Sequence, residues 1–326
     1  MFPIEGGSLV KREVGGVKAV NDVSFQVRFG ESLGIVGESG CGKSTTARLV
    51  MRLLEPTSGT IKFDGQDITH LRRRELRLLR ARLQIVFQDP YASLNPRMDV
   101  EAILSQPFRI HRIYKRKETL SRIRQVLDLV GLPKDCLSRY PNEFSGGQRQ
   151  RLGIARALCL KPSMLILDEP VSALDVSIQA QILNLLRELK AELGLSYLII
   201  AHDLSVVRHV SDRVAVMYLG SIVESADRDN FYASPLHPYS EALLSAVPVP
   251  EPVAERNRVQ IVLGGDPPSP ANPPLGCGFN PRCWKAADIC VESAPPLAAV
   301  DGGPPSHLVA CRFPAPVREV LRPSAG

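Results

Sequence analysis

Short apolar runs recur along the chain and alternate with segments of helical periodicity. Runs of this length are typical of strands that are buried on both faces. They lie at residues 33–36, 85–87, 164–167, 197–201 and 214–217. Helical stretches separate several of them, for example residues 44–54 and 177–193. The alternation predicts an α/β fold whose parallel sheet is covered by helices on both faces.

Two segments near the N-terminus have a different pattern and predict an antiparallel flap. Residues 23–27 alternate between apolar and polar, as a half-buried strand does. Residues 61–63 are followed by Asp64-Gly65, a dipeptide that favours the tight turn of a hairpin. We therefore expect this flap before the helical part of the chain.

The rest of the chain predicts a large domain over residues 1–247 and a small extension over 248–326. Within the large domain, residues from about 89 to 159 predict an inserted helical subdomain, because apolar residues recur at helical spacing. These residues are Ile123, Val126, Leu127 and Val130. Residues 248–255 are rich in Pro and Glu and predict a linker. The extension is rich in Pro and Gly, so we expect that a staple other than an apolar core holds it.

The composition of the chain bears on its cellular location and on its relation to a membrane. A hydrophobic fraction of 44% with 23% charged residues is ordinary for a globular protein, and no apolar run approaches the roughly 18 residues that span a bilayer. Without a basic and apolar leader, the sequence predicts a cytoplasmic protein that reaches a membrane only through a partner. The arginines between residues 72 and 82 have no interleaved aromatics. A solvated helix face near a membrane is therefore favoured over a nucleic-acid groove.

The loop after the first apolar run, Gly-Glu-Ser-Gly-Cys-Gly-Lys-Ser, matches the phosphate-binding pattern. Its glycines let backbone amides turn toward phosphates at the start of a helix. We expect Lys43 to reach the β- and γ-phosphates and Ser44 to bind Mg²⁺. The predicted ATP-binding residues here are Gly37, Glu38, Ser39, Gly40, Cys41, Gly42, Lys43, Ser44 and Thr45.

Polar residues follow three further apolar runs. They are Gln88, Asp168-Glu169 and His202. Ligands of open α/β sheets bind at the carboxyl ends of the strands, so these segments should meet at one edge of a sheet. We expect Asp168 to hold Mg²⁺ and Glu169 to orient and deprotonate the attacking water.

A further motif, Ser145-Gly146-Gly147-Gln148, stands 23 residues before Asp168 and precedes a helical pattern. Ser145 suits a helix N-cap, and the two glycines allow backbone amides to approach an anion.

Taken together, these motifs resemble the ATP-hydrolysing cassettes of ABC transporters over nearly the whole chain. The resemblance implies that the residues of the Ser145–Gln148 motif bind ATP held by an opposite cassette, so that two cassettes must dimerise. It assigns Gln88 to Mg²⁺ and to the loop that senses the transmembrane partner. Asp175 matches the loop that crosses the dimer, and His202 matches the switch on the γ-phosphate.

Later segments resemble the oligopeptide and dipeptide importer ATPases. They include His237-Pro-Tyr, Pro268-Ser-Pro and Asn280-Pro-Arg-Cys283, and the earlier stretch that begins at Gln88 has the same resemblance. This implies an ATPase subunit at the cytoplasmic face of the membrane. It would pair with an unlike second ATPase and two permease subunits, and indirectly with an extracytoplasmic solute-binding protein. Import of nickel or another peptide-like solute is the alternative. A soluble ABC ATPase is less favoured, because a coiled coil and a second cassette are absent.

The four cysteines of the extension leave three alternatives. Cys277, Cys283, Cys290 and Cys311 are separated by five, six and twenty residues. Zinc sites usually contain closer pairs, and disulfides are rare in a cytoplasm. Iron–sulfur ligands tolerate irregular spacing, and the family resembled has members with a four-iron cluster. A cluster, zinc and plain reduced cysteines all stay open. Cys41, Cys136 and Cys159 are interpreted as loop or core residues.

The N-terminus departs from the family pattern. Relatives have a further strand before the segment with which this chain begins. The resemblance leaves Phe2 as the residue that would stack on adenine. We expect either a start that lies further upstream or a missing first strand.

Overall fold

The computed structural model describes residues 2–6, 12–113, 115–248 and 260–315. The chain divides into two compact units: residues 1–26, 33–46 and 202–326 form the first, and 27–32 and 47–201 the second. After residue 248, the predicted linker lies outside the described residues. In the described ranges, no helix is long and apolar enough to cross a membrane.

Strands of the first unit lie in the order β11-β12-β10-β9-β3. Their bounds are β3 Ser32–Val36, β9 Arg213–Tyr218, β10 Ser221–Asp227, β11 Ala298–Ala299 and β12 Leu308–Val309. β3 and β9 are parallel, whereas β9 and β10 form an antiparallel pair. β12 extends this sheet from the C-terminal extension, because Val309 pairs with Glu224. The extension is therefore part of the same sheet as the strand before the phosphate loop.

Strands of the second unit are β6 (Leu83–Val86), β7 (Met164–Asp168) and β8 (Ser196–Ala201). They are parallel and lie in the order β8-β7-β6. All residues of β8 are buried, as the apolar run predicts. α7 (Val176–Leu193) supplies the crossover from β7 to β8 and matches the predicted helix at residues 177–193. The predicted α/β fold is confirmed. The predicted parallel pairing holds for β6, β7 and β8 and for β3 with β9, whereas β10, β11 and β12 pair antiparallel.

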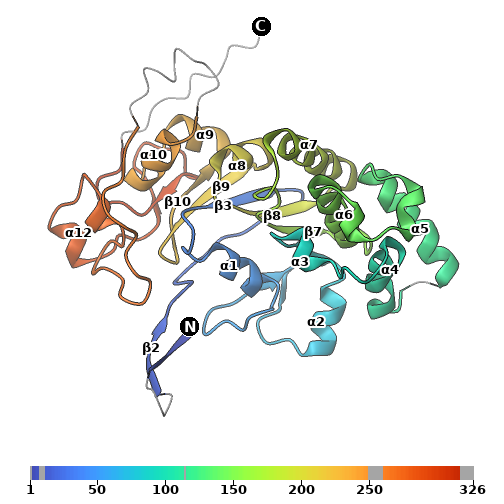
Figure 1. Cartoon of the computed structure of the whole chain (residues 1–326). Helices are drawn as coiled ribbons and strands as arrows, with labels where there is room; N and C mark the ends of the chain where they lie inside the picture. The colour runs from blue at the N-terminus through green and yellow to red at the C-terminus, as the bar shows by residue number, and fades with distance from the viewer. Residues whose placement is uncertain (1, 7–11, 114, 249–259, 316–326) are drawn as a thin grey trace, which may run out of the picture. The chain divides into compact units, whose positions relative to one another are not determined.

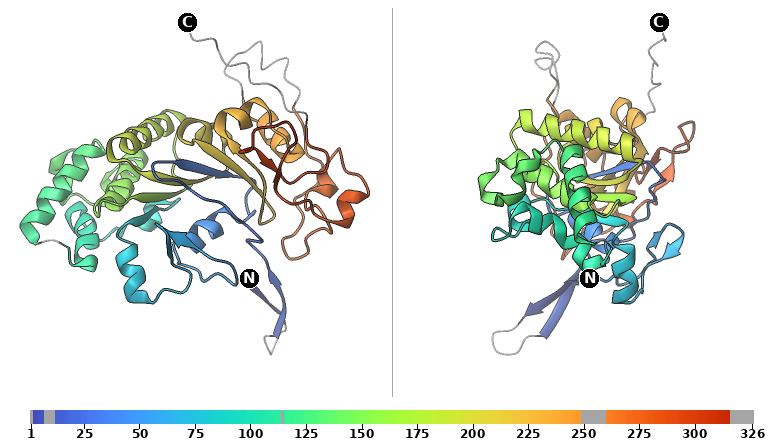
Figure 2. Two further views of the ribbon diagram at one scale, coloured as in Figure 1. Left: turned by 180° about the vertical axis from the view of Figure 1, so that it is seen from behind. Right: turned by 90° about the vertical axis from the view of Figure 1, so that its right-hand side faces the viewer.

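The predicted helical subdomain is confirmed within the second unit. Its elements are α3 (Pro90–Ser93), α4 (Val100–His111), α5 (Arg116–Leu129), η1 (Lys134–Ser138), η2 (Pro141–Glu143) and α6 (Gly146–Leu158). α4, α5 and α6 contact one another and lie side by side in Figures 1 and 2. Ile123, Val126 and Val130, at the predicted helical spacing, are fully buried and form part of their common core.

The antiparallel flap is only partly as predicted. The hairpin is confirmed: β4 (Lys62–Phe63) pairs with β5 (Gln66–Asp67), and Asp64 and Gly65 both have positive φ between them. Residues 23–27 form no strand, although Val23 and Phe25 are less exposed than their neighbours. Alternation reports which side chains face the protein, whereas a strand also needs a backbone partner. β1 (Phe2–Gly6) and β2 (Arg12–Val17) form a further antiparallel pair near the N-terminus.

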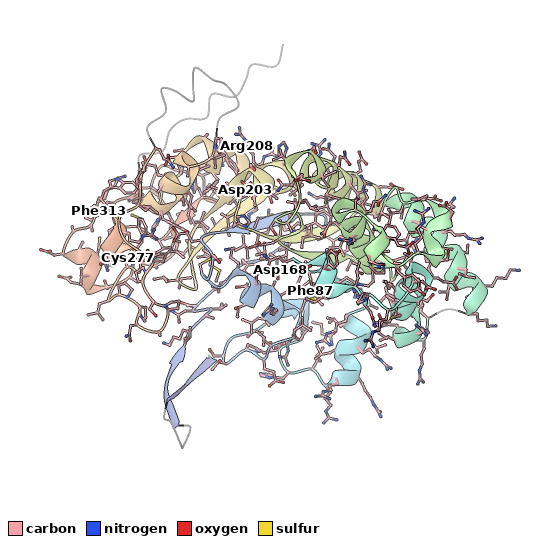
Figure 3. All side chains as sticks on the ribbon, in the orientation of Figure 1. Phe87, Asp168, Asp203, Arg208, Cys277 and Phe313 are labelled. Carbon is pink, nitrogen blue, oxygen red and sulfur yellow. The ribbon has the colours of Figure 1, made fainter. Side chains whose placement is uncertain are left out.

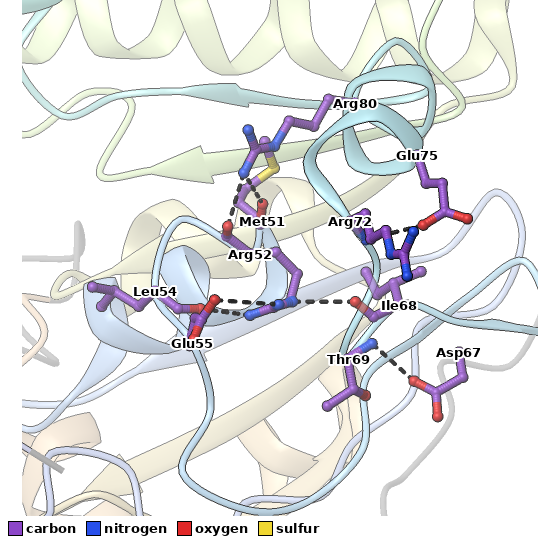
Figure 4. A network of polar contacts seen from close by, with 10 residues as sticks. All are labelled: Met51, Arg52, Leu54, Glu55, Asp67, Ile68, Thr69, Arg72, Glu75 and Arg80. Atoms are coloured by element: carbon purple, nitrogen blue, oxygen red, sulfur yellow. Dashed lines mark hydrogen bonds and ion pairs between the residues drawn. The ribbon is translucent and has the colours of Figure 1, made fainter.

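α1 (Lys43–Val50) ends before the predicted residue 54 because a network of arginines holds the following turn (Figure 4). Arg52 has a positive φ, and its Nε donates to Ile68 O over 3.1 Å. Arg80, which follows α2 (Arg73–Leu79), donates to Arg52 O over 2.8 Å and to Met51 O. The expected solvated face therefore holds for the exposed Arg72, Arg73, Arg74, Arg77 and Arg82, but not for Arg80.

The remaining elements belong to the first unit. They are α8 (Leu204–Val210), α9 (Arg228–Ala233), α10 (Pro238–Ser245), η3 (Asn280–Arg282) and α12 (Ile289–Glu292). Among the described residues of the extension, only Phe279, Cys290 and Val309 are buried apolar side chains. Phe279 packs between Tyr218 and Tyr239, with ring centroids 5.3 and 5.4 Å away. The buried aromatic side chain of the extension thus packs on residues of β9 and α10.

A buried carboxylate also anchors the extension. Glu224 of β10 is fully buried and accepts hydrogen bonds from the backbone N–H groups of Leu236 and His237, each over 2.8 Å. His307 Nε2 lies 2.7 Å from Glu224 Oε1 and donates to it. A buried carboxylate is stable only when such donors replace its hydration. Glu224 therefore connects the turn at Leu236 and His237, and also His307 of the extension, to β10, the strand with which β12 pairs.

We expect Glu224→Gln to lower the free energy of unfolding by about 2–4 kcal/mol. The amide NH₂ would face a backbone donor and leave a buried N–H without an acceptor. Urea denaturation measures the loss, and limited proteolysis should cut the extension first. Glu188→Gln, on an exposed position of α7, is the matched control and should change stability by less than about 0.5 kcal/mol. Equal stability of the two variants would contradict the anchoring role.

Candidate nucleotide site

The phosphate loop follows β3, and two of its glycines are required by close backbone neighbours. A Cβ at Gly37 would lie 2.1 Å from Met217 O, and one at Gly42 would lie 2.1 Å from Ala19 O. Both residues also have positive φ. The loop is therefore held against β9 and against the segment after β2, in a shape that larger residues cannot adopt.

Lys43 begins α1, and its ammonium group lies within the loop. Lys43 Nζ donates to Gly37 O over 2.7 Å and to Glu38 O over 2.8 Å, and the residue is 5% exposed. Ser44 and Thr45, in the first turn of α1, are half-buried, whereas Ser39 and Gly40 are exposed. A loop with an exposed tip, a central ammonium group and a helix N-terminus is suited to bind phosphates.

The acidic pair follows β7. Asp168 is its last residue and is 3% exposed, and Phe87 lies beside it where β6 ends (Figure 3). Glu169 has a φ of 49°, an uncommon value for a residue other than glycine, and its N–H donates to Ile200 O. Gln88 Nε2 donates to Glu169 Oε2 over 2.7 Å. The structure therefore brings two predicted catalytic side chains into direct contact and fixes the backbone of one.

The Ser145–Gln148 motif forms the N-terminus of α6. Ser145 is the N-cap: its Oγ accepts from Gln148 N, and its own N–H donates to Gln148 Oε1 over 3.0 Å. Ser145, Gly146 and Gln148 are exposed. Gly147 is buried, because a Cβ there would lie 2.5 Å from Ile178 Cγ2 of α7. The predicted N-cap is confirmed. One of the two glycines serves helix packing, a role that sequence reasoning missed.

The other predicted residues are placed as follows. Asp175 is exposed at the N-cap position of α7, and His202 is exposed directly after β8. Phe2 begins β1, and its side chain lies outside the described part of the structure. The phosphate loop and His202 belong to the first unit, whereas Gln88, Asp168, Glu169, the Ser145–Gln148 motif and Asp175 belong to the second.

The four cysteines of the extension line one pocket together with His237 and Phe279. Cys277 N–H donates to Cys290 O over 2.8 Å, and Gly276 has no room for a Cβ beside the same carbonyl. Phe313, which follows Cys311, lines the pocket as well (Figure 3). Burial raises the pKa of Cys277 and Cys283 and raises that of Cys311 to about 11. For these three cysteines the uncharged thiol is therefore favoured at neutral pH.

No group of three or more His, Cys, Asp or Glu side chains in the described ranges is arranged to hold a metal ion. The four cysteines predicted to bind a cluster are thus not gathered into a ligand shell. Cys41, Cys136 and Cys159 are buried, as expected for loop and core residues.

Comparison with known proteins identifies the chain. Residues 20–172 match the family described as ABC transporter, and residues 223–290 match the oligopeptide/dipeptide transporter C-terminal region. The oligopeptide transport ATP-binding protein AppF of Bacillus subtilis is 55% identical over 96% of this chain and 94% of its own length. The chain belongs to the ABC transporter ATP-binding proteins. The resemblance inferred from the motifs is confirmed.

Other members of this family are similarly close. A probable peptide ABC transporter ATP-binding protein of Sinorhizobium fredii is 53% identical over 99% of this chain and 90% of its own. Among solved structures, cbiO1 from Clostridium perfringens, part of an ABC transporter complex, gives a TM-score of 0.61 at 30% identity, covering 66% of this chain and 84% of its own. The ATP-binding cassette MJ0796, a dimer bound to ADP and Pi, gives 0.60 at 27% identity, covering 70% and 95%.

Membership of this family establishes the general chemistry of the chain. The fold is that of ABC cassettes, and the chain is an ATPase that uses ATP and Mg²⁺.

Proposed function

We propose that this ABC ATPase powers the import of dipeptides or oligopeptides. The observation that carries the proposal is the C-terminal region at residues 223–290, whose family is described by that cargo. The names of the relatives agree, since AppF is an oligopeptide transport protein and the Sinorhizobium fredii relative is a probable peptide transporter. Both lines of support concern the cargo and are independent of the ATPase chemistry.

The proposed catalytic cycle assigns each side chain a task. The loop amides and Lys43 would bind the phosphates, and Ser44, Gln88 and Asp168 would hold Mg²⁺. Glu169 orients and deprotonates the attacking water, and its contact with Gln88 fixes the carboxylate between turnovers. His202 contacts the γ-phosphate.

A second cassette completes the proposed site. The exposed Ser145, Gly146 and Gln148 would bind ATP held by that cassette, and the exposed Asp175 would cross between the two. The similar cassette MJ0796 is dimeric in its solved structure, which supports this arrangement. We propose an unlike ATPase as partner. Two permease subunits would hold the pair at the cytoplasmic face of the membrane, and an extracytoplasmic binding protein would deliver the solute.

We further propose that Cys277, Cys283, Cys290 and Cys311 bind a four-iron four-sulfur cluster. The shared pocket supports this proposal, because all four side chains line it. The small apolar core of the extension supports it too, since cluster binding would supply folding energy. On binding, the four sulfur atoms would have to turn toward one centre and lose their protons. Zinc is the competing occupant.

Transport assays can test the cargo. The complete transporter, purified with its own permeases and binding protein, would be reconstituted in liposomes. We expect di- or oligopeptides to stimulate ATP hydrolysis several-fold and to accumulate inside the liposomes, whereas nickel should do neither. Glu169→Gln complexes should take up no peptide, which controls for leakage. Stimulation by nickel but not by any peptide would overturn the proposed cargo and leave the ATPase assignment intact.

A further inference from the structure

Glu38, the second residue of the phosphate loop, is held through all of its polar groups. Its N–H donates to Tyr239 Oη over 2.8 Å, and its carbonyl oxygen accepts from Lys43 Nζ over 2.8 Å. The N–H of Cys41 also donates to this carbonyl oxygen. The carboxylate faces Arg282. A loop residue fixed at each polar group holds its neighbours in one conformation, so Glu38 sets the shape of the loop.

Arg282 reaches the phosphate loop from the C-terminal extension. It is the last residue of η3 and directly precedes Cys283. Its two terminal nitrogens donate to the two oxygens of Glu38 over 2.8 and 3.1 Å, which is a bidentate pair. The guanidinium side chain is 7% exposed and the Glu38 side chain 28%. Glu38 accordingly raises the pKa of Arg282, which stays charged at every physiological pH.

This ion pair removes the repulsion that the Glu38 carboxylate would otherwise exert on a bound triphosphate. A carboxylate in a site for triphosphate would repel the ligand, since both are negative and the pair is only partly exposed to solvent. Arg282 cancels that charge and at the same time holds Glu38 in place. Lys43 cannot neutralise and position the Glu38 carboxylate, because its ammonium group donates to the backbone carbonyl oxygens of Gly37 and Glu38 and is needed to bind the phosphates.

We propose that Arg282 is a positioning residue for ATP binding, supplied to the phosphate loop by the C-terminal extension. It neutralises Glu38 and orders the loop so that amides and Lys43 face the phosphates. Tyr239 of α10 supports the same loop residue from its backbone side. The extension is therefore part of the nucleotide site. This inference depends on neither the transported solute nor the cluster.

The experiment measures the dissociation constant of Mg-ATP for the full-length chain by titration calorimetry. We expect Arg282→Gln to raise this constant about tenfold or more, because it leaves the Glu38 carboxylate uncompensated. The double variant Glu38→Gln with Arg282→Gln should recover most of the affinity. Arg282→Lys, which keeps the charge but loses the bidentate geometry, should show a smaller loss.

Lys285→Ala is the matched control. Lys285 also belongs to the extension and lies near a carboxylate, Glu241 of α10, at 3.9 Å, but it does not touch the phosphate loop. Its removal should leave ATP affinity unchanged. Unchanged affinity in folded Arg282→Gln would overturn the proposal. A loss that Glu38→Gln fails to rescue would also overturn it, since that result indicates general damage to the extension. If Arg282→Gln does not fold, the proposal fails when Arg282→Lys binds Mg-ATP as tightly as the natural chain does.

Discussion

Glu169→Gln should abolish turnover and leave ATP binding intact. The substitution removes the base that takes a proton from the attacking water, and loss of a general base lowers rates by about 100- to 10,000-fold. Affinity should stay within about twofold, because Lys43 and the loop amides bind the phosphates. The amide of glutamine can still meet Gln88, which lies 2.7 Å from the carboxylate in the natural chain. We therefore expect this variant to trap ATP in a closed pair of cassettes.

The measurement combines single-turnover hydrolysis with nucleotide titration, in the presence of the partner ATPase. Glu192→Gln, on an exposed position of α7, is the matched control and should hydrolyse ATP at the normal rate. Lys43→Ala should show the opposite pattern and lose binding first. Normal turnover in Glu169→Gln would show that another group serves as the base.

Anaerobically purified protein should be brown and should contain about four iron atoms per chain if the cluster proposal holds. Replacing any one of Cys277, Cys283, Cys290 or Cys311 by Ser should remove the colour and most of the iron. Proteases should then cut the extension, because its own apolar core is small. Iron and sulfide analysis, visible absorption and limited proteolysis provide three separate measurements.

Cys159→Ser is the control for this series. Cys159 lies in the core, and its Sγ donates to Leu104 O or Ala155 O, bonds that a serine hydroxyl can also form. This variant should keep its colour and its iron. Colourless protein from an iron-replete anaerobic preparation would refute the cluster, and stoichiometric zinc in its place would identify the other occupant.

Local sequence patterns predicted most of the fold and the separate parts of the site. The phosphate loop, the N-cap Ser145 and the Asp64-Gly65 hairpin each depend on a few neighbouring residues, so their patterns are readable in one sequence. The ion pair between Glu38 and Arg282 joins residues 244 positions apart, and no local sequence pattern predicts a contact over that separation. The sequence predicted that Gln88 and Glu169 lie at the same edge of the sheet, because they follow adjacent strands, but it did not predict their hydrogen bond.

At residues 23–27 a local pattern was present, but it predicted a strand that does not form. Their alternation of apolar and polar side chains correctly predicted which residues are less exposed, but the backbone has no strand partner. Arg80 shows a similar limit, because charge alone did not reveal that it holds the turn after α1. In both cases the outcome depends on backbone groups elsewhere in the chain.

The main-chain contact at Gly147 has a mechanical consequence. The Ile178 side chain occupies the space that a Cβ at position 147 would need, so it packs directly on the backbone of Gly147 near the beginnings of α6 and α7. The Ser145–Gln148 motif and Asp175 stand at these two beginnings. We expect them to shift together, so that a chain that docks on one would also position the other. We therefore expect the two segments to move as one unit when a second cassette docks.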